Sequence, residues 1–488
     1  MTIKKIIGLV LGIVFLFVFI ALPAPQSMLD VLIEGPPADP EAAAAAQVAG
    51  RKAMVYIGLF AMFLSFMITG VTFEAMIALL IISLLAIFKL ADLNTIFAPF
   101  HGNTVWLVIP GFGIAAALQK CGLLKRIAFA IMQFFPENYR GQVMSIYACG
   151  VVMSPLLPSI SAKALLMAPL SATVAKELGF EKSSKGAAGL FSASFMSSWV
   201  LGNAFFTGSL FVFIMMGFIP QNDQAAYPLD WISWFKMTWI WFLVMAILGF
   251  ISVLLLFKPE KELTMEKGFA KKQLQALGPM SRVEKVTLAI LALAIIGWIL
   301  QRQIGVDASI TAIVALALMA LFGDFNVTDL RTKIPWETAV LIGGIMSIAN
   351  FVSLLKIDKW LGAILGPALS PIVGNIWLFV PALCVIIYVL RYAIVSQIAT
   401  GTMVIAFFIA LTSAVGINTA VLAFVTFVGV QVWNLSFHNT GAIGAIAATG
   451  GDMIEHKDIV ASSYAFMAVN LIAMTASIPL WKILGLVP

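Results

Sequence analysis

A lysine inside a long apolar segment is the residue whose type and position most suggest chemistry. Lys163 closely follows Pro155 and Pro158, and proline removes backbone hydrogen bonds from a helix, so the sequence predicts a broken helix here. Ser159 and Ser161 are N-cap residue types, so a second half-helix that begins there directs its positive dipole end at the break. Burying a lysine in hydrocarbon costs roughly 3 kcal/mol or more, which favours a functional role. The segment therefore predicts an anion-binding site.

The alternative is a proline kink that serves packing only, with a lysine that snorkels to the membrane interface. A second copy of the pattern favours the functional interpretation. Three pairs of polar landmarks recur at nearly one offset: Thr104 and Thr338 (234 residues apart), Ser159 and Ser396 (237) and Thr207 and Thr440 (233). Transporters built from internal repeats place their substrate site where the broken helices of the two halves meet. The second break has no proline, so Gly401 and nearby hydroxyl groups must permit any unwinding.

The predicted substrate-binding residues lie on the two breaks and on the two segments expected to line the gap between them. They are Ser159, Ile160, Ser161, Lys163, Thr207, Gly208, Ser396, Gln397, Ile398, Thr400, His438, Asn439 and Thr440. Two of the neighbouring polar residues keep alternative interpretations. His438 is either a ligand or a packing histidine, and Arg391 is either part of the site or paired with a hairpin or interface group.

The composition limits the class of protein. Of the 488 residues, 61% are hydrophobic and 11% are charged, and the mean hydropathy is +1.04, so the chain is a polytopic membrane protein. The net charge of +6 lies in loops, where basic residues set topology, and it predicts no nucleic-acid partner. The three cysteines and three histidines show no metal-ligand spacing, and no catalytic motif is present. Neither a metal nor a cofactor is predicted, and an intramembrane enzyme has no motif in its favour.

Hydropathy and turn residues predict the elements in order. A first helix over 6–22 follows Lys4 and Lys5, and a retained helix is favoured over a cleaved signal peptide. An acidic loop without Lys or Arg follows over 25–50, and seven Lys or Arg against four Glu mark 258–285 as a cytoplasmic loop. The other predicted elements are two spans over 53–92 that part near Gly70, a re-entrant hairpin over 104–134, a broken helix over 140–178, a small-residue helix over 186–217, spans over 231–257, 286–301 and 308–323, a second hairpin from 334 and a second broken helix from 391.

These landmarks resemble the divalent anion:sodium symporter (DASS) family over nearly the whole chain. They are most similar to its branch of citrate/succinate antiporters and 2-oxoglutarate/malate translocators. The motifs that carry the resemblance are Leu22-Pro-Ala-Pro25, Thr104-Val-Trp-Leu107, Gly122-Leu-Leu-Lys-Arg-Ile127, Ser154 to Lys163, Gly278-Pro-Met-Ser-Arg-Val-Glu284, and Trp336 with Gly343-Gly344.

The resemblance implies an all-α polytopic membrane protein with two inverted-topology repeats, re-entrant hairpins, discontinuous helices and an elevator mechanism. It also implies a homodimer in the bacterial inner membrane that carries di- or tricarboxylates by exchange or with sodium. The corresponding division of the chain is 1–103 (scaffold), 104–217 (first half of the transport domain), 218–333 (scaffold with the basic loop) and 334–488 (second half of the transport domain).

The chain departs from the family pattern at both breaks. The family's Ser-Asn-Thr is Ser159-Ile160-Ser161 here, and its second Ser-x-Thr is Ser396-Gln397-Ile398. Lys163 stands where the antiporter branch has Arg, and Thr400 stands where it has His. Because a fixed ammonium can neutralise a dianion in place of sodium, Lys163 is predicted to be the substrate's counter-charge. Exchange of organic dianions is therefore favoured, and sodium-coupled symport of dicarboxylates or of sulfate- or sulfonate-like anions is the alternative.

The orientation in the membrane has two interpretations. Three spans before the first hairpin, combined with the positive-inside rule, place Lys4, Lys5 and the loop 258–285 inside and open the first hairpin to the outside. The resemblance implies that this hairpin opens to the inside.

Overall fold

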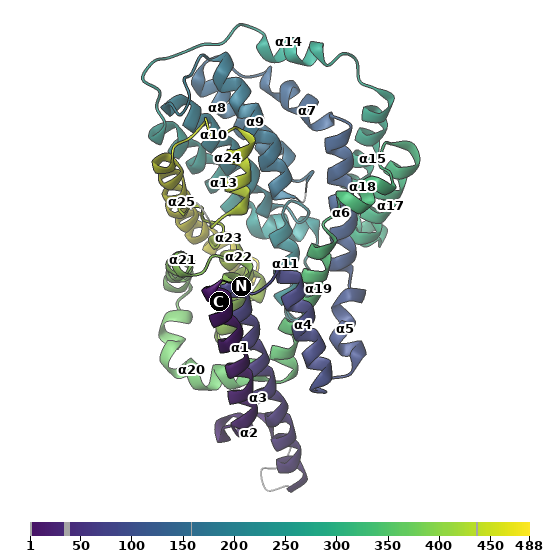
Figure 1. Cartoon of the computed structure of the whole chain (residues 1–488), viewed down its shortest axis with the longest axis vertical. Helices are drawn as coiled ribbons and strands as arrows, with labels where there is room; N and C mark the ends of the chain where they lie inside the picture. The colour runs from purple at the N-terminus through teal and green to yellow at the C-terminus, as the bar shows by residue number, and fades with distance from the viewer. Residues whose placement is uncertain (1, 34–39, 158, 436–437) are drawn as a thin grey trace.

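The computed structural model describes residues 2–33, 40–157, 159–435 and 438–488, and the regular elements over these residues are helices (Figure 1). Eight helical segments are long and apolar enough to cross a membrane. The helices are α1 (Ile3–Ala21), α2 (Gln26–Leu32), α3 (Pro40–Thr69), α4 (Glu74–Ile87), α5 (Leu93–His101), α6 (Asn103–Lys120), α7 (Leu123–Met132), α8 (Tyr139–Met153), α9 (Ile160–Glu177), α10 (Lys185–Phe195), α11 (Leu210–Phe218), α12 (Gln221–Ala226), α13 (Trp231–Leu256), α14 (Phe269–Ala276), α15 (Arg282–Ile299), α16 (Gln301–Ile304), α17 (Ala308–Phe322), α18 (Val327–Thr332), α19 (Trp336–Leu354), α20 (Ile357–Val373), α21 (Ile376–Ala393), α22 (Gln397–Ala414), α23 (Thr419–Gly429), α24 (Thr440–Ala448) and α25 (His456–Ile483).

The N-terminal helices form the end of the molecule that lies farthest from α14 (Figure 1). Helix α1 packs along α3, where Gly8 meets Thr69 and Gly12 meets Phe66, because small residues let two backbones approach closely. The predicted acidic loop over 25–50 is wrong in two places. Residues 26–32 form α2, and α3 already begins at Pro40, because five consecutive alanines over 42–46 strongly favour helix. The predicted loop residues 34–39 lie outside the described residues.

Both predicted hairpins are helix-turn-helix units. Helices α6 and α7 meet at Gly122, and α19 and α20 meet at Lys356; both residues adopt positive φ, 80° and 53° respectively. Helix α5 leads directly into α6, the first arm of the first hairpin. Together they form a segment over Leu93–Lys120 that is 28 residues long, enough to cross a membrane.

Both predicted helix breaks are confirmed. Helix α8 ends at Met153 and α9 begins at Ile160, while α21 ends at Ala393 and α22 begins at Gln397. Pro158, one of the two prolines on which the first prediction depended, lies outside the described residues. The second break forms without a proline, as its sequence requires.

The small-residue segment over 186–217 is not one helix, which corrects the prediction. Helix α10 passes into a π-helical turn at Met196–Val200 and a 3-10 turn at Leu201–Ala204, and α11 begins only at Leu210. Serine and glycine are weak helix formers, and Ser209 caps the new helix by accepting a hydrogen bond from the amide of Phe211 at 3.2 Å. A third gap thus separates two helices near the middle of the molecule.

The two halves of the chain pack on each other reciprocally. Helices α4 and α17 start 234 residues apart, as do the predicted hairpin landmarks, and α4 packs on α19 while α17 packs on α6. Helices α13 and α25, which close the two halves, pack along each other. The side-chain amides of Asn203 and Gln431 exchange two hydrogen bonds of 3.1 Å each across the junction of the halves. This arrangement is the one that two related repeats would produce.

One buried ion pair joins the first hairpin to the second half. The guanidinium of Arg126 donates to Glu284 at 2.7 Å and to the carbonyl of Gly278 at 2.9 Å, and Glu284 also forms the capping box of α15 with Ser281. The hydrogen bond from Arg126 lowers the pKa of Glu284 below its ordinary value. The charged carboxylate therefore stabilises the folded state.

We expect Glu284→Gln to lower the melting temperature at pH 7 by about 2 °C, since it removes a charge-assisted pair. A lowered pKa contributes stability that is complete above the unfolded pKa, about 4.3, and is lost as pH falls through the folded value. The difference between variant and parent should therefore shrink as the pH falls below about 4.3 and disappear below the lowered pKa of the folded state. Tryptophan fluorescence on heating measures it, and Glu266→Gln, an exposed carboxylate paired with Lys272, is the control. A pH-independent difference would contradict this assignment.

Candidate substrate-binding site

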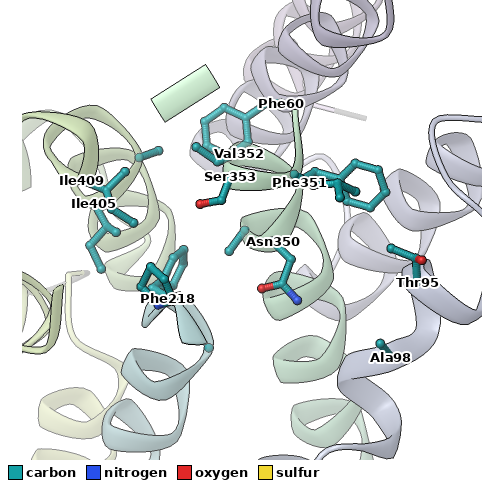
Figure 2. Close-up of a pocket in the computed structure, with 15 residues that line it drawn as sticks. Phe60, Thr95, Ala98, Phe218, Asn350, Phe351, Val352, Ser353, Ile405 and Ile409 are labelled. Atoms are coloured by element: carbon teal, nitrogen blue, oxygen red, sulfur yellow. The ribbon is translucent and has the colours of Figure 1, made fainter. Parts of the chain in front are cut away.

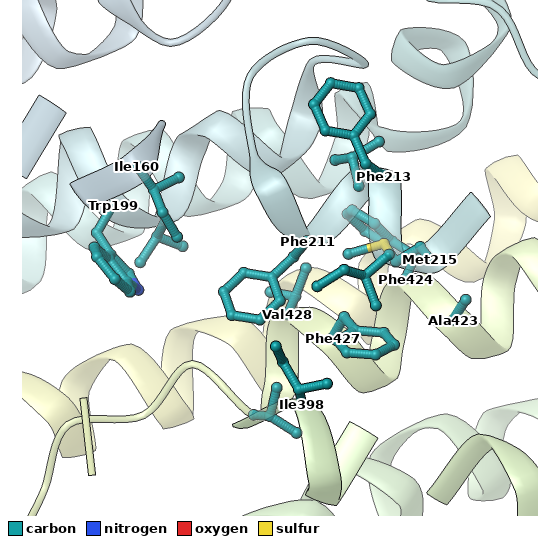
Figure 3. Close-up of a cluster of buried hydrophobic side chains, with 14 of the residues drawn as sticks. Ile160, Trp199, Phe211, Phe213, Met215, Ile398, Ala423, Phe424, Phe427 and Val428 are labelled. Carbon is teal, nitrogen blue, oxygen red and sulfur yellow. The ribbon is translucent and has the colours of Figure 1, made fainter. Parts of the chain in front are cut away.

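A cavity of about 490 Å³ lies between the two helix breaks and the loop that joins α3 to α4. Its lining comes from both halves of the chain and from the N-terminal helices. It consists of Lys4, Met67, Ile68, Thr69, Gly70, Thr72, Glu74, Ile160, Ser161, Trp199, Leu210, Phe211, Val395, Ser396, Gln397, Ile398, His438 and Thr440. Figure 3 shows how Ile160 and Trp199 from the first half lie toward Phe211 and Ile398.

Four helices that follow the breaks and their lining loops begin at this cavity, in addition to α1 and α4, whose first-turn residues Lys4 and Glu74 also line it. The first-turn residues Ile160 of α9, Leu210 of α11 and Gln397 of α22 line it, and so does Thr440, the first residue of α24. Each helix is capped by a side chain, namely Ser159, Ser209, Ser396 or Asn439. The start of a helix carries roughly half a positive charge and free N–H groups. Four such ends at one cavity form an environment for an anion with more than one negative charge.

Lys163 lies fully buried behind the first break and does not line the cavity. Its ammonium donates to the carbonyl oxygen of Gly208 at 2.7 Å and lies 3.5 Å from that of Ser154. Gly202 makes room for it, because a Cβ there would lie 2.4 Å from the Lys163 nitrogen. The lysine therefore ties the end of α8 to the loop that precedes α11, and both of these segments bound the site.

Arg391 joins the second break to a lining loop, as Lys163 does at the first break. Its guanidinium donates to the carbonyl oxygens of Ile394 and Val395 at 2.6 Å each and to that of His438 at 2.8 Å. The first two carbonyls belong to the unwound segment, and the third belongs to the loop that precedes α24. Each half of the chain therefore has one buried cation that binds the carbonyls of its own break and of its own lining loop.

These two cations make the surroundings of the cavity positive. Among the described residues, neither Lys163 nor Arg391 forms an ion pair with a carboxylate. Glu74 is the one acidic residue in the lining, and its carboxylate accepts a hydrogen bond of 2.8 Å from Ser396. The amide nitrogen of Gln397 is buried with no hydrogen-bond partner in the described part of the chain, so it is available to an acceptor on a ligand.

The structure divides the predicted site residues into two groups. Those that line the cavity are Ile160, Ser161, Ser396, Gln397, Ile398, His438 and Thr440. Those that lie behind it are Ser159, Lys163, Thr207, Gly208, Thr400 and Asn439. In the second group, Thr207 donates to the carbonyl of Pro155 at 3.2 Å and Thr400 to that of Ser396 at 2.8 Å, so both hold the shape of a break. Residues 158, 436 and 437 lie outside the described residues.

Sequence reasoning missed the contributions of Lys4, Glu74, Trp199 and Phe211. Glu74 had a usable signal, because an acidic residue between two apolar segments is a functional candidate by default. Trp199 and Phe211 had none, since aromatic residues in membrane helices more often pack than bind. Lys4 reaches the cavity only because α1 folds back along α3.

A second cavity of about 440 Å³ lies among α3, α5, the end of α19 and α22, and Figure 2 shows Phe60, Asn350, Phe351 and Ile405 around it. No ionisable side chain belongs to its lining. It therefore offers a dianion no compensating charge, and the first cavity is the better candidate. Among the described residues there is also no group of three metal-ligating side chains.

A family described as "Sodium:sulfate symporter transmembrane region" matches residues 44–487 of the chain. The chain belongs to this family. Over 56% of its length, the chain is 29% identical to the inner membrane protein YbhI of Escherichia coli, and the match covers 57% of YbhI. The chain is 24% identical over 58% of its length to the putative malate transporter YflS of Bacillus subtilis, 60% of which is covered. It is 20% identical over 82% of its length to the chloroplastic dicarboxylate transporter 2.1 of Arabidopsis thaliana, 72% of which is covered.

A solved structure has the same fold. The YdaH transporter of Alcanivorax borkumensis, whose topology was described as unusual, superposes with a TM-score of 0.52 over 85% of this chain and 98% of its own, at 14% identity. Family and fold thus agree with the polytopic all-α membrane architecture that the composition predicts.

We expect Arg391→Gln to destabilise the folded protein by about 3 kcal/mol or more, because three buried carbonyl oxygens lose their donors. The melting temperature of the purified protein in detergent measures the loss. Arg331→Gln, which removes an exposed guanidinium on α18, should leave it unchanged. Equal melting temperatures for the two variants would show that Arg391 does not hold the second break.

Proposed function

We propose that the protein is a secondary active transporter that exchanges di- or tricarboxylate-like organic dianions across the membrane. The observation that carries the proposal is the convergence of four helix N-termini on one cavity between two cation-braced helix breaks. These helix starts, together with the two buried cations behind the cavity, favour a ligand with more than one negative charge. The family and its relatives are transporters, which supports transport over catalysis.

The lining favours a particular class of anion. Ile160 and Ile398 present apolar side chains where the related pattern has polar ones, while Ser161, Gln397 and Thr440 supply hydrogen-bond donors. An anion with two charged ends and an apolar middle fits such a lining. The names of two relatives, a putative malate transporter and a dicarboxylate transporter, support a dicarboxylate. The inner-membrane relative supports a place in the bacterial inner membrane.

The two buried cations support exchange without sodium. Carbonyl oxygens that converge at a helix break are the usual ligands of a transported sodium ion. Here the ammonium of Lys163 and the guanidinium of Arg391 already occupy such positions. Lys163 therefore acts through the carbonyls that it binds and through its charge, without touching the substrate. Sodium-coupled symport is the alternative, because the family description names sodium and sulfate.

The place of the cavity supports an elevator mechanism, which we propose takes place in a homodimer. Seven of the lining residues, including Lys4, Thr72 and Glu74, belong to the proposed scaffold, residues 1–103, and the other eleven belong to the proposed transport domain. A single hydrogen bond, from Ser396 to Glu74, joins the two sides at the cavity among the described residues. A site on the boundary between two such units becomes accessible from one side at a time when one unit moves past the other.

Exchange in proteoliposomes tests the function. We expect uptake of labelled malate only when the vesicles contain unlabelled dicarboxylate, because exchange requires a substrate on each side. Replacing sodium with choline on both sides should change the initial rate by less than about twofold, since the cation positions are already filled. Uptake into empty vesicles that follows an imposed sodium gradient would establish the symport alternative.

The variants of Lys163 test the role of the fixed cation. Lys163→Ala should reduce exchange more than tenfold in sodium-free buffer, because the carbonyl oxygens of Ser154 and Gly208 lose their charged donor. Lys163→Arg should keep measurable exchange, since it restores the charge. Lys176→Ala, which removes an exposed lysine in the last turn of the same helix, is the matched control. Normal exchange by a folded Lys163→Ala variant would show that the cation is dispensable.

A further inference from the structure

A third cavity, of about 390 Å³, lies between the beginning of α8 and the end of α13, away from the candidate substrate site. It combines basic residues with apolar ones. Its lining consists of Asn138, Tyr139, Arg140, Ile251, Leu254, Leu255, Lys258, Pro259 and Glu262. The proposed transport cycle gives this cavity no role.

One hydrogen bond fixes the two cations of this cavity relative to each other. The hydroxyl of Tyr139 donates to the carbonyl of Phe257 at 2.7 Å, and Arg140 and Lys258 are the next residues along the chain. The amide of Met265 donates to the carbonyl of Glu137 at 2.9 Å, which holds the following loop against the same helix start. Both cations are exposed, and in the described part of the chain neither takes part in a hydrogen bond or an ion pair.

The cavity lies where an apolar, outward-facing stripe of α13 ends. The stripe consists of exposed side chains spaced by four residues: Trp239, Leu243, Ile247, Ile251 and Leu255. Residues four apart are neighbours on a helix surface, so these side chains form a continuous stripe that winds gradually round α13, and the chain turns polar from Lys258 onward. Leu255 is 75% exposed and, with Ile251, also lines the cavity. An exposed apolar surface of α13 therefore leads to the cavity that Arg140 and Lys258 line.

We propose that this cavity binds a phospholipid with one net negative charge and a hydroxyl-bearing headgroup, such as phosphatidylglycerol. Its phosphate would lie between Arg140 and Lys258, at the positive end of the 15-residue helix α8, and its acyl chain along Ile251 and Leu255. Two cations and the carboxylate of Glu262 leave one net positive charge, which matches a singly charged lipid. The carboxylate accepts a hydrogen bond from a headgroup hydroxyl.

Lipid binding to the full chain in detergent tests this site. Native mass spectrometry with added phosphatidylglycerol, phosphatidylethanolamine or phosphatidylcholine should show the tightest binding for phosphatidylglycerol. The variant Arg140→Gln/Lys258→Gln should bind it about 30-fold more weakly, the loss expected for two cations near a membrane surface. Each single variant should lose about fivefold.

The matched control is Lys267→Gln/Lys271→Gln, which removes the same charge from the same segment but outside the cavity and should bind like the parent. Glycerol phosphate at millimolar concentration should not compete, because it lacks the acyl chain. If both double variants lose the same affinity for phosphatidylglycerol, net charge alone explains the effect and the proposed site is wrong. Equal binding of phosphatidylcholine, or full competition by glycerol phosphate, would overturn it as well.

Discussion

The structure depends on satisfying the backbone carbonyls that two helix breaks expose deep inside a membrane protein. Each exposed carbonyl without a partner costs several kcal/mol where water is absent. Lys163 and Arg391 supply the donors, and each binds its own break together with the adjoining lining loop. A side chain that holds both walls of a gap also fixes the width of that gap. The same two residues therefore carry stability and the geometry of the cavity.

The use of cationic side chains as donors to the carbonyl oxygens has an electrostatic consequence. Lys163 and Arg391 donate to neutral carbonyl oxygens, so in their charged forms they add to the positive field of the helix dipoles. Burying two charges without carboxylate partners is costly, and a bound dianion offsets that cost. Glu74 reduces the positive field at one edge of the cavity. Its hydrogen bond with Ser396 also joins the proposed scaffold to the proposed transport domain, which move relative to each other in the proposed mechanism. In the proposed elevator mechanism, binding and movement are coupled through this edge of the cavity.

The two cavities proposed to bind ligands use similar chemistry at different depths. Inside the molecule, capped helix starts and carbonyl-bound cations surround the cavity proposed to bind a small anion. At the surface, the start of α8 and two cations with no bonding partner among the described residues lie beside an apolar part of α13. The inner cations are engaged by the protein and act as structure, whereas the outer ones are available to a ligand. The partners of a cation, more than its residue type, decide which role it has.

The sequence by itself determined the features that follow from local backbone chemistry. Prolines and N-cap serines located the breaks before Ile160 and Gln397, glycine and a polar turn located the hairpins, and the offset near 234 residues revealed the correspondence of the two halves. Only the tertiary structure decided that Lys163 faces carbonyls behind the cavity, that the segment over 186–217 is broken, and that Glu74 joins the lining. A cap or a turn is specified within a few residues, whereas the direction of a side chain depends on helices hundreds of residues away. For that reason the position of a cavity between the two breaks could be predicted, and the residues that line it could be predicted only in part.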